Sequence, residues 1–188
     1  MNDVLLISEN KVRTYSNIST NTQTSYLLPA IREAQTDYEL IIGSKLYNKI
    51  ISLVENGDIK KEENYKYKNL LDKSQFYLLY NTISKICVIA NYHIDNFGIT
   101  TSTDEHIQSL SMNDVLKMKD LYEKKAESHL KRLQMFILNF KNDYPELCDT
   151  QINEFRSNLY SATNTSIWLG GVRGRGYYKN NQLRNKYE

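Results

Sequence analysis

Hydrophobic residues in the first third of the chain recur at spacings of three and four, the period of an amphipathic helix. Residues 25–57 predict two helices joined at Gly43, which can take the left-handed geometry that ends a helix. Pro29 suits the first turn of the first helix. Ser44 is expected to cap the second helix, and Gly57 to end it. The positions expected to be buried are Ile31, Ala34, Tyr38, Ile41, Ile42, Leu46, Ile50, Leu53 and Val54.

The most hydrophobic stretch of the chain is residues 74–97, SQFYLLYNTISKICVIANYHIDNF. Its apolar residues follow a helical period and occupy nearly every side, so we expect a central helix that neighbours cover on most faces and that ends at Gly98. The residues that carry this period are Phe76, Leu79, Tyr80, Ile83, Ile86, Cys87, Ala90, Ile94 and Phe97.

A β-branched, polar stretch and a second long helix follow. Residues 99–101 and 107–110 predict a short hairpin or projecting loop that turns at 103–105. Ser111, with Asp114 three residues later, resembles a capping box, and a proline-marked boundary at 143–145 ends the helix. Its expected buried stripe is Met112, Val115, Met118, Tyr122, Ala126, Leu130, Leu133, Ile137 and Phe140.

The remaining segments predict arms around this bundle. Residues 1–22 begin with a short apolar run, 4–7, that is either a strand or a docking segment, and continue as polar loop. The charged residues 58–73 indicate a solvated helix or helical turn, and 146–165 hold one short helix through Ile152, Phe155 and Leu159. We therefore predict an all-α fold, a small bundle of four to five helices with a short β-hairpin or loop projection and extended N- and C-terminal arms. Residues 1–145 form the helical domain, and 146–188 the short helix and basic tail.

Charge is divided unevenly between the body and the tail. Five of the 24 basic residues but only one of the 22 acidic residues lie in the last sixteen positions, so the tail is basic and the body slightly acidic. The 2 cysteines are expected to be buried free thiols in a reducing compartment. No secretory leader and no membrane-spanning window is present, which predicts a soluble protein that folds inside a cell.

The residues that could carry chemistry do not form a recognisable catalytic or metal-binding set. His93, His106 and His129 lie on three different segments without the spacing of metal ligands. No GxSxG nucleophile elbow occurs. The acidic pairs 62–63 and 104–105 are most simply solvated surface, because a catalytic pair needs burial to separate its pKa values. We expect no enzyme activity, no cofactor and no metal.

The C-terminal tail is the best candidate for a binding segment. Its glycine cluster, GGVRGRG, lacks the ending of a phosphate-binding loop, but arginines and tyrosines beside glycine can follow a nucleic-acid backbone by charge and stacking. The alternative is an arm that docks on a protein neighbour, which we favour because the apolar residues that open it resemble an anchor. The candidate binding residues are Ile167, Trp168, Leu169, Arg173, Arg175, Tyr177 and Tyr178.

The stretch YLLPAIREAQTDYELIIGSKLYNKI resembles the head–tail connector (adaptor, or neck ring) proteins of tailed bacteriophages, especially crAss-like and related phages of Bacteroides. The pattern in that family is roughly P-x-I-x-x-A-Q followed by L/I-G-x-x-L-Y. The matching residues here are Pro29, Ile31, Ala34, Gln35, Gly43, Leu46 and Tyr47, and Leu169-Gly170-Gly171 matches in the tail.

This resemblance implies a structural virion protein that forms a ring, dodecameric in such connectors, below the portal, extends the DNA channel and joins the portal to the tail. Its partners would be further copies of the chain, the portal protein and further neck or tail proteins, with non-specific DNA contact in the channel and no membrane. It would be assembled in the host cytoplasm and reside in the virion. The loop that faces the channel or an adjacent ring would contain Thr101, Thr103, Asp104, Glu105 and His106. The alternative function is a nucleic-acid-binding module that uses the Arg/Gly/Tyr-rich tail.

Overall fold

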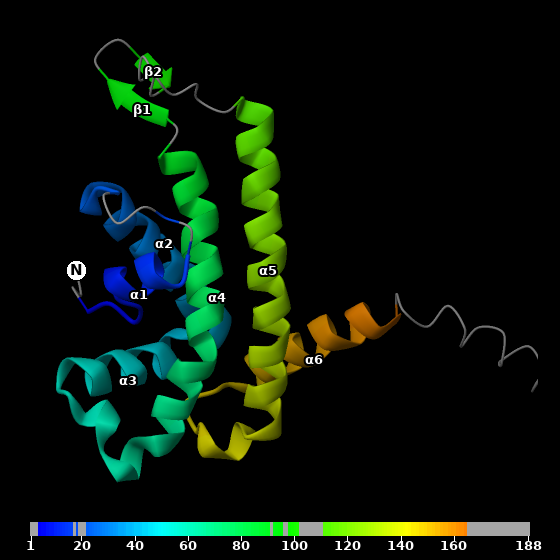
Figure 1. Ribbon diagram of the computed structural model, residues 1–188. Coiled ribbons are helices and arrows are strands. Elements are labelled where there is room, and N and C mark those ends of the chain that lie inside the picture. The colour runs from blue at the N-terminus through cyan, green and yellow to red at the C-terminus, as the bar shows by residue number, and fades with distance from the viewer. Residues whose placement is uncertain are drawn as a thin grey trace, which may run out of the picture.

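The computed structural model describes residues 4–16, 18, 22–90, 92–95, 98–101 and 111–164, and the side chains of these except 92–95, 98–101 and 160–164. The longest helices, α4 and α5, run side by side, with α1 to α3 on the other side of α4 (Figure 1). This confirms the predicted all-α class with a hairpin projection. The elements are α1 (Glu9–Thr14), α2 (Thr24–Ile42), α3 (Ser44–Glu55), the 3-10 turns η1 (Asp58–Lys60) and η2 (Glu62–Asn64), α4 (Tyr65–Ile89), β1 (Tyr92–Asp95), β2 (Gly98–Thr101), α5 (Met112–Asn139), η3 (Lys141–Asp143) and α6 (Asp149–Asn164).

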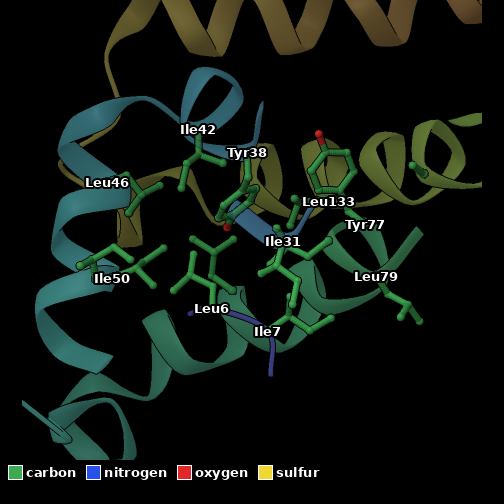
Figure 2. Packing of buried hydrophobic residues seen from close by; sticks show 14 of the residues in the cluster. Leu6, Ile7, Ile31, Tyr38, Ile42, Leu46, Ile50, Tyr77, Leu79 and Leu133 are labelled. Carbon is green, nitrogen blue, oxygen red and sulfur yellow. The ribbon is translucent and has the colours of Figure 1, made fainter. Parts of the chain in front are cut away.

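One hydrophobic core joins these helices, and α4 passes through its middle. Burying one such aliphatic side chain contributes about 1.5–3 kcal/mol. Figure 2 shows side chains from the N-terminal segment and from α2 to α5 converging on one another. The labelled members are Leu6, Ile7, Ile31, Tyr38, Ile42, Leu46, Ile50, Tyr77, Leu79 and Leu133.

Polar groups fix the register of α2 against α4. The Tyr38 hydroxyl lies 2.7 Å from the Ser74 hydroxyl, and both side chains are buried. The Asn81 amide donates to Asp37 at 3.0 Å, and the Lys85 ammonium lies 3.1 Å from the same carboxylate. Because a buried polar group is costly unless it is paired, these contacts select one alignment of the two helices.

The helix pair predicted for 25–57 is present, but the positions predicted for Pro29 and Ser44 at the helix starts are corrected by the structure. α2 begins at Thr24, so Pro29 lies inside the helix and not in its first turn, because burial of Leu27 extends the apolar stripe towards the N-terminus. Ser44 is the first residue of α3 and makes no capping hydrogen bond through its side chain. Gly43 does end α2, with φ of 83°, and Gly57 has φ of 75° after α3.

A hairpin is present, but its pairing is not the predicted one: the predicted first strand, 99–101, lies within β2 and pairs with β1 on its N-terminal side. β1 pairs antiparallel with β2, and Asp95 is opposite Gly98. The central helix therefore ends at Ile89, and the placement of Ile94 in that helix was wrong. The sequence Tyr92-His-Ile-Asp95 suits a strand when Gly98–Thr101 is beside it, a tertiary preference that helical periodicity does not reveal. The predicted second strand, 107–110, lies outside the described residues.

The helix start at Ser111 is confirmed. The Asp114 backbone N–H donates to the Ser111 hydroxyl oxygen at 3.3 Å, and that hydroxyl donates to the Asp114 carboxylate at 2.7 Å. The predicted stripe of α5 is only partly buried, because α4 covers one side of the helix. Met112, Met118 and the C-capping Phe140, expected in the core, are exposed.

The short helix predicted after residue 146 is α6, and its first turns pack on the body. Phe155 is buried in the common core, and the Tyr144 hydroxyl donates to the Lys66 carbonyl at 3.1 Å. The expectation of two buried cysteines holds in part: Cys87 is half-buried, but Cys148 is exposed because it precedes the first turn of α6 on the surface.

Candidate functional site

The site residues predicted from the sequence fall almost entirely outside the described structure. Thr101 is the last residue of β2. The rest of the proposed channel loop, Thr103, Asp104, Glu105 and His106, lies outside the described residues, as do the tail residues Ile167, Trp168, Leu169, Arg173, Arg175, Tyr177 and Tyr178. These assignments stay predictions.

Within the described part of the chain, no group of three or more His, Cys, Asp or Glu side chains is arranged to hold a metal ion. The acidic pair Glu62 and Glu63 lies in the exposed turn η2, as expected of solvated surface. His93 lies in β1, apart from His129 in α5.

Four rings from α4 and α5 form a stack on one surface of the molecule. We call Phe76, Tyr80, Tyr122 and His129 the aromatic ladder. The His129 ring lies 5.2 Å from the Phe76 ring and 5.3 Å from the Tyr80 ring, between centroids, and is within 30° of parallel to both. The Tyr80 and Tyr122 rings are 6.4 Å apart and also stacked. Such aromatic contacts are worth about 0.5–1.5 kcal/mol each beyond the area that they bury.

The helical repeat explains how the ladder arises. Phe76 and Tyr80 are four residues apart on α4, and Tyr122 and His129 are seven apart on α5, so each pair lies on one face of its helix. Because α4 and α5 lie side by side, rings from the two helices interleave. The ladder was not predicted from the sequence because the helical period placed Phe76 in the core, whereas 49% of the Phe76 surface is exposed. The aromatic spacings were visible, but their pairing depends on the register of the two helices.

The ladder borders a groove that we call the Phe76 groove, with a volume of about 460 Å³. Leu133, Phe136 and Phe76 supply apolar surface, while Lys73 and Arg132 bring positive charge. Its lining residues are Asn69, Asp72, Lys73, Phe76, His129, Arg132, Leu133 and Phe136. A smaller cavity of about 240 Å³ also borders Phe76, and Lys11 of α1 and the following Tyr15 help to line it.

Cations outnumber acids along this surface. The Lys125 ammonium lies 4.8 Å from the Tyr122 ring centroid and 5.6 Å from that of Tyr80, within the range of a cation–π interaction. Lys11, Lys73 and Arg132 add positive charge beside the groove, and Asp72 is the one carboxylate among the residues that line the two cavities.

His129 acts in this stack as an aromatic ring and not as a cation. Burial lowers the pKa of His129 below its usual value, and the nearby Arg132 guanidinium lowers this pKa further. The imidazole is therefore uncharged at neutral pH. An apolar surface with a positive rim and no activated nucleophile suits the binding of a partner that presents an apolar group among carboxylates or phosphates.

The fold is all-α, and the surface of α4 and α5 carries an apolar groove with a positive rim. The chain belongs to a family of unknown function, DUF6712, whose profile matches residues 38–157, from the middle of α2 into α6. No curated protein and no solved structure matches the chain. Among the helices that the structure describes, none combines the length and apolarity needed to cross a bilayer.

Proposed function

We propose that this chain is a structural subunit of a ring-shaped head–tail connector in a tailed bacteriophage, located between the portal and the tail. The observation that carries the proposal is α5, which leaves large apolar side chains exposed along its length in one copy of the chain. These are Met112, Leu116, Met118, Leu121 and Met135, with Phe140 at the C-cap. Apolar side chains gathered on one helix favour a further protein surface that covers them.

The residues that carry the resemblance to connector proteins also support the proposal. Ile31, Ala34 and Leu46 are fully buried, and the Gln35 amide donates to the Tyr47 hydroxyl at 3.2 Å. The motif therefore specifies the packing of α2 on α3 and not a catalytic site. This favours a family whose members share the packing of these two helices and not a catalytic site.

The shape of the helix pair is suited to a ring subunit. α4 and α5 extend beyond the rest of the body and carry the hairpin of β1 and β2 at their far end (Figure 1). In a ring, such a projection could reach the channel or a neighbouring ring, while the basic tail beyond α6 could bind the portal protein. The expected partners remain further copies of the chain, in a dodecamer, the portal protein and further neck or tail proteins.

The proposal is tested in a phage that encodes the protein. A phage without this gene product should produce DNA-filled heads and free tails that do not join, and electron microscopy of wild-type particles should place the protein at the neck. Normal tailed particles in its absence would refute the proposal.

Truncation separates the connector from the nucleic-acid alternative. Removing residues 166–188 should leave a folded body that no longer binds the portal protein in a pull-down. If the truncated chain still binds the portal but loses a salt-dependent affinity for DNA, the tail serves nucleic-acid binding instead.

A further inference from the structure

The Phe76 groove and α2 lie on opposite sides of α4. Ser74 is fully buried and meets Tyr38 of α2, whereas Phe76, two residues further along, is half exposed. Two residues of an α-helix are separated by about 200° around its axis. The surface of α2 that faces away from α4 therefore points away from the groove.

The exposed side of α2 carries one prominent apolar side chain, and two carboxylates lie beside it at the edge that meets α4, where Asn81 and Lys85 contact Asp37. Leu40 is 77% exposed, the largest value among the exposed large hydrophobic residues of the described chain. Glu33 and Asp37 precede it at spacings of seven and three, so the three side chains form one stripe along the helix. The Glu33 and Asp37 side chains are 54% and 36% exposed, and they share a single cation, Lys85. We call Glu33, Asp37 and Leu40 the α2 stripe.

The α2 stripe and the Phe76 groove are complementary in chemistry. The stripe presents an apolar side chain beside two carboxylates that share one ammonium group. The groove presents an apolar floor, with Leu133 and Phe136, beside the cations Lys73 and Arg132. Burying Leu40 on that floor would remove apolar surface from water on both sides, and the charges would favour one orientation.

We propose that the α2 stripe of one copy of the chain docks in the Phe76 groove of the next copy. This inference rests on the proposed ring function and names the contact between neighbouring subunits. Because the two surfaces lie on opposite sides of α4, a pair of copies cannot satisfy both contacts at once. The contact is therefore heterologous, and repetition closes a ring or extends a filament.

The charge of the groove disfavours the chain's own tail as the occupant. The tail contains Arg173, Arg175 and Lys179, which Lys73 and Arg132 would repel. The acidic stripe does not have this conflict. A second copy of the chain is thus the occupant that the charges favour.

Two single substitutions test this contact, because each damages one half of it. Leu40→Asp removes the apolar contact of the stripe, and Phe76→Asp places a charge in the groove. Both side chains are substantially exposed, so thermal unfolding followed by circular dichroism should show folded proteins. In light scattering and sedimentation velocity, wild type should form multi-subunit species that grow with concentration, and each variant should remain monomeric.

An equimolar mixture of the two variants provides the decisive measurement. The intact groove of Leu40→Asp should bind the intact stripe of Phe76→Asp, and growth should stop at a heterodimer, because both remaining surfaces are damaged. Tyr65→Asp is the matched control, since Tyr65 is 64% exposed at the start of α4 but does not line the groove, and it should assemble as wild type does. Arg132→Glu should weaken the heterodimer by about tenfold or more at low salt, with a smaller effect at high salt.

Other results of these assays would overturn the contact. Assembly that survives both substitutions, or a mixture that stays monomeric, would place the subunit interface elsewhere and leave the connector proposal standing. A wild type that stays monomeric at its highest soluble concentration would also exclude this contact as the one that joins copies. Binding of a fluorescent oligothymidine that is lost on Phe76→Asp would assign the groove to nucleic acid. Absence of the protein from phage necks would instead refute the connector and leave the measured contact intact.

Discussion

The Gln35 side-chain amide nitrogen lies 3.2 Å from the Tyr47 hydroxyl oxygen, and this contact ties α2 to α3. The same amide holds the N-terminal segment: its oxygen accepts from the Leu6 N–H at 2.8 Å, and its nitrogen donates to the Val4 carbonyl at 3.2 Å. Gln75 of α4 completes this arrangement by donating to the Leu6 carbonyl at 3.0 Å. Two glutamine side chains thus pair with backbone groups of the segment before α1.

Replacing Gln35 by Leu should destabilise the protein by about 2–3 kcal/mol, since the buried Leu6 N–H loses its acceptor and the Tyr47 hydroxyl its donor. Urea unfolding measures the loss, and hydrogen exchange at Leu6 should accelerate more than exchange within α5. Thr36→Ala, an exposed change on the same helix, should have an effect within about 0.5 kcal/mol of zero. Equal unfolding free energies for Gln35→Leu and wild type would show that the amide does not hold the segment.

Gly43 should tolerate a side chain less well than Gly57, although φ is positive at both positions. A β-carbon at Gly43 would overlap the Gln151 side chain of α6, while at Gly57 it would meet nothing within 4 Å. We expect Gly57→Ala to cost about 1 kcal/mol from backbone strain alone. Gly43→Ala should cost about 3 kcal/mol, because its ψ of 146° is also unfavourable for alanine and because Gln151 must move.

The unfolding free energies of both variants can be compared in urea, with Gln151→Ala as a second background. Gln151 also accepts from the Cys148 N–H at 3.2 Å, so its displacement costs a hydrogen bond. The penalty of Gly43→Ala should therefore shrink, but not vanish, when Gln151 is already alanine. A penalty that is the same in both backgrounds would exclude the overlap as a cause.

The longer helices were predictable because each buries a periodic apolar face, whereas α1 (Glu9–Thr14) lies in residues 1–22, which were expected to be irregular. The pattern of Ile31, Ala34 and Tyr38 is the pattern of side chains that the core covers. The capping pair Ser111 and Asp114 was also predictable from local sequence. A spacing of three residues brings the Asp114 backbone N–H to the Ser111 hydroxyl at a helix start.

What the sequence did not reveal depends on contacts between distant segments. Ile94 continues a helical period but belongs to β1, because pairing with Ile99 of β2 competes with one more turn of helix. Phe76 is a large apolar residue of the kind usually found in a core, but it is half exposed because it stacks on His129 at the surface of the helix pair. The groove beside it depends on the register of α4 against α5, and periodicity within one helix carries no information about that register.

A hydrogen bond between Tyr67 and Glu146 joins α4 to the segment before α6, and its contribution to the free energy of unfolding can be measured separately. The Tyr67 hydroxyl donates to one Glu146 carboxylate oxygen at 2.6 Å, and the other carboxylate oxygen is buried without a hydrogen-bond partner among the described residues. Tyr67→Phe should therefore cost about 2 kcal/mol, because a hydrogen bond to a charged group is lost and the carboxylate stays half buried.

A double-mutant cycle with Glu146→Gln isolates this pair. The coupling free energy between the two substitutions, from urea unfolding, should be about 1–2 kcal/mol. Tyr65→Phe is the control, since Tyr65 is 64% exposed at the start of the same helix and should change stability little. Strictly additive effects would mean that the 2.6 Å contact contributes nothing beyond packing.

Stability should fall steeply in alkali, because several tyrosines are buried as neutral phenols. Burial raises the pKa of Tyr144 to about 12, and burial likewise raises the pKa values of Tyr38, Tyr67 and Tyr77 above their usual value of 10.0. Between pH 10 and 12 the unfolded chain loses these protons while the folded chain keeps them. Since the folded state then binds more protons, the free energy of unfolding decreases as pH rises through this window, and below pH 10 the contribution is fully present.

Urea unfolding at pH 8, 10 and 11 measures this slope, and absorbance of tyrosinate follows the titration directly. Tyr144→Phe should reduce the slope above pH 10, because one proton fewer is released on unfolding, whereas the exposed Tyr65→Phe should leave it unchanged. Part of the tyrosinate signal should appear only together with loss of helical circular dichroism. If all 15 tyrosines titrated near pH 10 in the folded protein, the phenols assigned to the core would have to be accessible to water.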